Sequence, residues 1–188
     1  MGLGNLGREY AGTRHNAGFM VAERLAVRWR ATWKLEKRFK ARLAKSERDY
    51  RAVWLCQPQT FMNASGESVQ AVRAFYQVPP PNILVVVDDA DLPLGEIRLR
   101  PKGGTGGHHG LESVEQHLGS QDYARQRIGI GRREADTREI TDHVLGCFGK
   151  DEAGLLEKVL LRSCEQIECW LAAGIQPAMN RFNGTVEI

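Results

Sequence analysis

The residues best suited to acid–base chemistry lie in one histidine-containing stretch and one acidic turn. His15 lies in TRHN (residues 13–16), just before an amphipathic pattern that predicts a helix. A histidine at such a loop–helix junction is accessible to a substrate and not buried. At neutral pH an imidazole can take a proton from water, and a nearby carboxylate would orient the ring and stabilise its cationic form. The turn DDAD (residues 88–91) offers such carboxylates. By position alone, a structural role for His15 is the simpler interpretation.

A second candidate segment is the basic, glycine-rich stretch KGGTGGHHG, residues 102–110. It leads into a helical pattern at Leu111, and backbone amides exposed in this way can bind a phosphate, although a mobile lid is an alternative. His108 and His109 would point roughly 100° apart on a helix, so a shared metal would need another ligand. The chain has no Walker triplet, CxxC or HExxH, so we expect no metal and no cofactor.

The segment FMNASG, residues 61–66, offers a carboxamide beside a helix start. The amide of Asn63 can both donate and accept, which suits recognition of an ester or a peptide group. Asn63 could equally cap the helix, and Ser65 is a further candidate for the N-cap.

The stretch GLGNLG, residues 2–7, matches the dinucleotide fingerprint GxGxxG letter for letter. The fingerprint requires a preceding strand and a helix that opens on the glycines, and here only Met1 precedes it. The motif therefore favours a tight turn that lets the backbone or Asn5 approach a ligand.

The elements that must position these residues follow from hydrophobic periodicity. Short apolar runs at 52–56, 83–87 and 127–131 predict buried strands. The second run ends at the acidic turn 88–91, so a strand there would place these carboxylates at the edge of a sheet, which is where open α/β sheets bind ligands. Amphipathic patterns predict helices that begin near Val21, span 65–76, and run from Asp151 to about Ala173 with Gly174 as the stop. The alternation predicts an α/β sandwich.

Composition predicts one globular domain over residues 1–188, with 42% apolar and 26% charged residues. No apolar run approaches the ~20 residues of a membrane span, and four irregularly spaced cysteines suit a reducing cytosol, so we expect a cytoplasmic protein. The net charge of +3 permits a polyanionic partner without requiring one. Basic residues gather around the glycine-rich stretches, either as a solvated face or as phosphate contacts: Arg98, Arg100, Lys102, Arg125, Arg127, Arg132 and Arg133.

Six segments occur in a single order through the chain, namely GLGNLGREY, TRHNAG, PQTFMNASG, ILVVVDDADLPLG, KGGTGGHHGLESV and RIGIG, and MNRFNG follows the last long helix. In this order and spacing the chain closely resembles bacterial peptidyl-tRNA hydrolase. The resemblance implies a single-domain, three-layer α/β/α sandwich with a mixed sheet. It also implies hydrolysis of the ester in peptidyl-tRNA released prematurely from ribosomes, and it implies no metal. Nothing in the sequence demands an interface, so we expect a monomer.

The resemblance also assigns roles. His15 matches the base that activates water, Asp88 the carboxylate that stabilises its protonated form, and Asn5 the residue that distinguishes blocked from free aminoacyl esters. The further residues expected to contact substrate are Tyr10, Phe61, Met62 and Asn63. An ester needs a nucleophile and stabilisation of its oxyanion, and activated water with amide donors supplies both. Arg100, Lys102 and Arg127 are candidates for holding tRNA phosphates.

Two other functions compete with this one. A catalytically weak RNA-binding relative, similar to a splicing factor, would bind tRNA without turnover. A nucleotide-dependent oxidoreductase, based on GxGxxG alone, would bind a dinucleotide saturably, which we do not expect.

The chain departs from the family pattern at three places. His109 stands where the family usually has asparagine, which brings a larger and titratable side chain to substrate binding. Leu6 replaces the usual proline after Asn5, and this removes a constraint on φ that could loosen the presentation of Asn5. The apolar strand that usually precedes GLGN is reduced here to Met1, so the start of the sequence is expected to be trimmed or misassigned.

Overall fold

A computed structural model describes residues 1–131 and 139–186 of the chain. Two of the predicted arginines, Arg132 and Arg133, lie outside these residues. The helices are α1 (Ala17–Arg28), α2 (Ser65–Tyr76), α3 (His109–Leu118), α4 (Ile140–Leu145), α5 (Ala153–Ala173) and α6 (Ile175–Phe182). The strands are β1 (Lys34–Glu36), β2 (Ala41–Arg48), β3 (Arg51–Pro58), β4 (Leu84–Asp89), β5 (Glu96–Arg100), β6 (Ala124–Gly129) and β7 (Gly184–Thr185).

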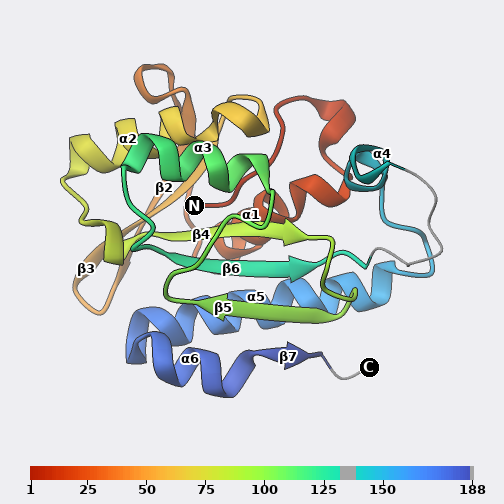
Figure 1. Cartoon of the computed structure of the whole chain (residues 1–188). Coiled ribbons are helices and arrows are strands. Elements are labelled where there is room, and N and C mark those ends of the chain that lie inside the picture. Colours follow the sequence, from red (N-terminus) through yellow and green to blue (C-terminus); the bar gives the residue numbers. More distant parts are fainter. Residues whose placement is uncertain (132–138, 187–188) are drawn as a thin grey trace.

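The strands form a mixed α/β architecture with helices on both faces, as expected (Figure 1). One sheet has the order β4-β6-β5-β7, in which β4 and β6 are parallel and the other pairs are antiparallel. The second sheet is the antiparallel β1-β2-β3. Gly2 links the two sheets, because it pairs with Val86 of β4 and donates its N–H to the carbonyl of Cys56 in β3.

Alternation along β4 supplies apolar side chains to both faces of the sheet. Val85 and Val87 pack with Leu111 and Val114 of α3, whereas Leu84 and Val86 belong to the larger core formed with α1 and α5. A strand that is buried on both faces reads as a continuous apolar run, which is why 83–87 was recognisable in the sequence. No helix among the described residues is long and apolar enough to cross a membrane.

Close packing, and not a ligand, explains the glycines at the start of GLGNLG. A Cβ on Gly2 would lie 2.1 Å from the carbonyl oxygen of Gly18, and one on Gly18 would lie 2.3 Å from that of Val86. The first turn of α1 therefore approaches the backbone of Gly2 and β4 more closely than any side chain would allow. This contact fixes where the residues just before α1, including His15, lie relative to the end of β4.

The predicted bounds of one strand were wrong, and neither candidate N-cap of α2 serves as its cap. The strand predicted at 127–131 runs instead from Ala124 to Gly129, because the buried polar residues Arg125 and Gln126 hide its first half. Neither Asn63 nor Ser65 caps α2: Ala64 occupies the N-cap without a side-chain hydrogen bond, and Ser65 is the first helical residue. The hydroxyl of Ser65 is buried without a partner.

Candidate active site

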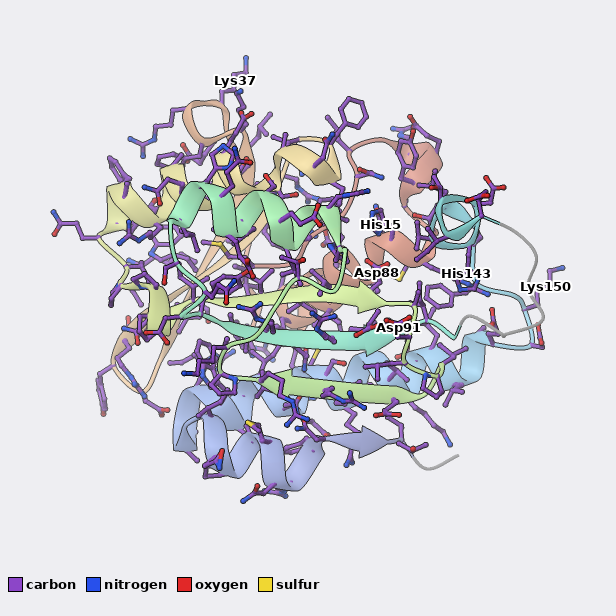
Figure 2. The ribbon with its side chains drawn as sticks, viewed as in Figure 1. His15, Lys37, Asp88, Asp91, His143 and Lys150 are labelled. Carbon is purple, nitrogen blue, oxygen red and sulfur yellow. The ribbon has the colours of Figure 1, made fainter. Side chains whose placement is uncertain are left out.

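His15 and Asp88, which are 73 residues apart in sequence, lie in direct contact at the carboxyl end of β4 (Figure 2). The Nδ1 atom of His15 is 2.9 Å and 3.0 Å from the two carboxylate oxygens of Asp88. His15 lies in a short 3-10 helix, Arg14–Asn16, that leads into α1, and Asp88 is the fifth residue of β4. Because a carboxylate only accepts, Nδ1 carries the proton and Nε2 is left with the lone pair that a general base needs.

A third side chain, His108, completes this cluster and was missed as a functional residue in the sequence. Its Nε2 lies 3.1 Å from Asp88 Oδ1, and its ring centroid is 5.2 Å from that of His15. Its Nδ1 accepts hydrogen bonds from the backbone N–H groups of Gly110 and Leu111, so His108 is the N-cap of α3. This cap fixes the tautomer, because a nitrogen that accepts two amides leaves the proton on Nε2, which donates to Asp88.

The carboxylate of Asp88 is only 2% exposed. Burial raises its pKa, but the hydrogen bonds and the electrostatic attraction of the two histidine N–H groups, on His108 and His15, lower it by more, and the pKa lies well below its ordinary value. Asp88 is therefore an anion at any pH at which the protein would work. A fixed anion behind Nδ1 is the arrangement that stabilises an imidazolium as it forms on His15.

The same three residues have the composition of a metal site, with ligand atoms within 4.8 Å of one another. The hydrogen bonds of these residues do not fit metal binding. A metal bound to Nε2 of His108 would move the ring proton to Nδ1, where two N–H groups of α3 already donate. The donor set therefore fits a hydrogen-bonded chain that leads from α3 through His108 and Asp88 to His15.

The cluster opens into a cavity of about 250 Å³. Five of the predicted site residues line it: Asn5, His15, Asp88, His109 and Arg127. The rest of its wall comes from the acidic turn that follows Asp88, from the glycine-rich segment with His108, and from α4. A larger cavity of about 600 Å³ lies between β3 and β4, but none of the predicted site residues lines it.

Asn5 is held firmly although Leu6 stands where a proline was expected. Its backbone N–H donates to Asn16 Oδ1 at 2.8 Å, and Asn16 Nδ2 returns a bond to its carbonyl at 3.1 Å. The side-chain oxygen of Asn5 accepts the N–H of Met62 at 2.8 Å. The side-chain NH₂ is therefore left to donate toward a ligand.

The other predicted substrate contacts lie outside the cavity lining. Phe61 and Asn63 are exposed, Tyr10 is half-buried, and Met62 is buried in the core beneath α3. Arg100 and Lys102 are exposed and lie outside the cavity lining. Arg127 donates to Asp89 at 3.0 Å and to the carbonyls of Gly104 and Thr105 at 2.8 and 3.2 Å.

Comparison with known proteins places this site in a family. The family profile described as "Peptidyl-tRNA hydrolase" matches residues 1–187. A peptidyl-tRNA hydrolase of Synechococcus sp. is 46% identical over 97% of this chain and 81% of its own length. One of Geobacillus kaustophilus is 43% identical over 97% of each chain.

Solved structures agree with the sequence relatives. A crystal structure of peptidyl-tRNA hydrolase in complex with N-propanol superposes with a TM-score of 0.92 at 36% identity, and covers 100% of this chain and 94% of the other. The crystal structure of peptidyl-tRNA hydrolase from Acinetobacter baumannii gives a TM-score of 0.91 at 37% identity, over 98% and 93%. The sequence resemblance is confirmed, and this chain belongs to the peptidyl-tRNA hydrolase family.

Proposed function

We propose that this protein hydrolyses the ester that joins a peptide to the terminal ribose of tRNA, and so returns tRNA from peptidyl-tRNA that left the ribosome early. The observation that carries the proposal is the His15–Asp88 contact at the cavity, where an imidazole is oriented by a buried anion. A water-activating base with no covalent nucleophile suits an ester, whose leaving group is a good one.

In the proposed reaction, Nε2 of His15 removes a proton from water while the water oxygen bonds to the ester carbonyl carbon. The carbonyl electrons move to oxygen, and the side-chain NH₂ of Asn5 is positioned to donate to the acyl group. The tetrahedral intermediate then collapses, the bond to the ribose oxygen breaks, and His15 returns its proton to that oxygen. Asp88 stays ionised throughout and stabilises the transient imidazolium.

We propose that tRNA phosphates meet the exposed cations Arg100 and Lys102. Neither has a hydrogen-bond or ion-pair partner among the described residues, so both are available to a polyanion. Arg127 is less available, because its donors already bind Asp89 and two loop carbonyls. A cytoplasmic monomer suits this substrate, which arises wherever ribosomes work.

Replacing Arg100 with glutamine is expected to weaken tRNA affinity similarly for all tRNA sequences and to reduce the slope of log K against log salt by about one. The physical reason is the loss of one released counterion. Filter binding of a non-hydrolysable aminoacyl-tRNA analogue between about 50 and 200 mM salt measures this. An unchanged slope would remove Arg100 from the tRNA interface.

One assay distinguishes hydrolysis from the alternative function, which is RNA binding without catalysis. The wild-type protein is incubated with N-blocked and with free aminoacyl-tRNA, and release of the acyl group is followed. We expect release from the blocked ester and much slower release from the free one. Tight tRNA binding with neither ester hydrolysed would favour the splicing-factor-like alternative.

His109 gives a further prediction, because the family resemblance leads us to expect asparagine at its position. Its side chain is 76% exposed and its Nδ1 lies 3.0 Å from Glu112. His109→Asn exchanges an imidazole in the cavity lining for the smaller, neutral amide that the family resemblance leads us to expect, so KM should fall while kcat stays near the wild-type value. Equal KM values in both proteins would show that the side chain at position 109 does not affect substrate binding.

A further inference from the structure

Arg125 of β6 is a charged residue in an unusual position. Its side chain is only 1% exposed, and it is among the largest fully buried side chains of the described residues. Arginine is almost never fully buried unless it is paired, because removing its charge from water is costly. A buried guanidinium therefore indicates that its geometry serves a purpose that an apolar side chain could not.

The hydrogen bonds of Arg125 converge on the glycine-rich segment and on α3. Its Nη1 donates to the carbonyls of Gly103 and Gly104, and lies 3.3 Å from Glu115 Oε1 in α3. Its Nη2 donates to the carbonyl of Gln121, beyond the end of α3, at 3.0 Å. The planar guanidinium thus joins the segment that precedes α3 to the helix itself.

Few other contacts hold the glycine-rich segment against α3. Gly103, Gly106 and Gly107 all have positive φ, at 152°, 62° and 74°. A Cβ added at Gly103, Gly104 or Gly107 would meet nothing within 4 Å, so these glycines are not packed against neighbouring groups. Hydrogen bonds from Arg125 and Arg127 to the loop carbonyls therefore replace packing as the restraint.

Within this segment, directly after Gly107, lies His108, which contacts Asp88. We propose that Arg125 is a positioning residue for the hydrolysis reaction: it holds the glycine-rich segment against α3 so that His108 stays in hydrogen bond with Asp88. The effect reaches His15 only through His108 and Asp88, and Arg125 itself lies outside the lining of the cavity. This inference rests on the proposed function for its kinetic readout only.

The test is Arg125→Lys, which keeps the positive charge but cannot span both carbonyls and Glu115 with one ammonium group. We expect kcat to fall about tenfold while KM changes less than about twofold. In ¹⁵N spectra of the histidine rings, the Nε2–H tautomer of His108 should give way to a mixture. The matched control is Arg98→Lys on β5, directly opposite Arg127. Among the described residues the side chain of Arg98 bonds only Glu96, so this variant should leave both readouts unchanged.

A folded Arg125→Lys protein with wild-type kcat and an unaltered His108 spectrum would overturn the proposal, even if its thermal stability were lower. Should that variant not fold, Glu115→Gln keeps the arginine and weakens its anchor on α3. It should shift the same two readouts in the same direction by less, and no shift would also overturn the proposal. If the wild-type protein hydrolysed no ester, the proposed function would fail, whereas the His108 spectrum would still test the restraint.

Discussion

Replacing His15 with alanine is expected to lower the rate of ester hydrolysis by about 10² to 10⁴, the usual contribution of a positioned general base. This corresponds to about 3 to 5 kcal/mol of transition-state stabilisation. The side chain of His15 is 13% exposed and lines the cavity, so removing its imidazole should leave the hydrophobic core intact. Single-turnover hydrolysis of N-blocked aminoacyl-tRNA measures the chemical step, and binding of a non-hydrolysable analogue should stay near the wild-type value.

A matched control for His15 lies on α3. In the described part of the chain the side chain of His117 bonds only the carbonyl of Ser113, within its own helix, and it lies outside the cavity lining. The His117→Ala variant should therefore hydrolyse the ester at the wild-type rate. If His15→Ala kept the wild-type rate as well, another group would be activating water. If both variants lost activity together with tRNA binding, the loss would reflect damage to the fold and not to the base.

The sequence predicted well those elements whose side chains are apolar in a simple period. The run at 83–87 is continuous because β4 is buried on both faces, and α2 was predicted at its observed bounds, 65–76. Gly174, with φ of 89°, ends α5 as expected. In each case the local pattern and the tertiary burial agree, so the pattern alone was sufficient.

Elements with polar faces could not be predicted in this way. Alternation on β5 places Ile97 and Leu99 in the core but three charged residues on its other side, and its five residues give too short a signal. The buried guanidinium of Arg125 is compatible with a strand because the loop carbonyls and Glu115 accept from its Nη1 group, although its Nε has no partner among the described residues. Those partners lie ten or more residues away, so no local window in the sequence contains them.

The candidate site shows the same division. Neither periodicity nor spacing joins His15 to Asp88; that pairing was expected from the family resemblance, and the structure brings the two residues together. His108 was considered only as a metal ligand, because a histidine that caps a helix with one nitrogen and contacts a carboxylate with the other has no sequence signature. The observable signal was a histidine directly before a helical pattern, which is where an N-cap belongs.

Asp88→Asn should reduce hydrolysis by roughly 10² to 10⁴ through the tautomer of His15. In the wild-type protein the carboxylate accepts hydrogen bonds from two N–H donors, Nδ1 of His15 and Nε2 of His108. An amide has one accepting oxygen and one donating NH₂, so it cannot accept from both rings without placing its NH₂ against one of them. The cap on His108 holds that tautomer, so His15 is the ring that must change, and moving its proton to Nε2 removes the base.

Stability against pH gives an independent check on the same substitution. The pKa of Asp88 is lowered in the folded protein, so its ionised form stabilises the fold above the unfolded pKa of about 3.9, and this contribution is lost as pH falls toward the folded pKa. The wild-type protein should therefore lose unfolding free energy more steeply than Asp88→Asn below about pH 4. Urea unfolding at pH 3 to 7 measures both slopes. Parallel slopes, or a variant with the wild-type rate of hydrolysis, would mean that His15 does not depend on this carboxylate.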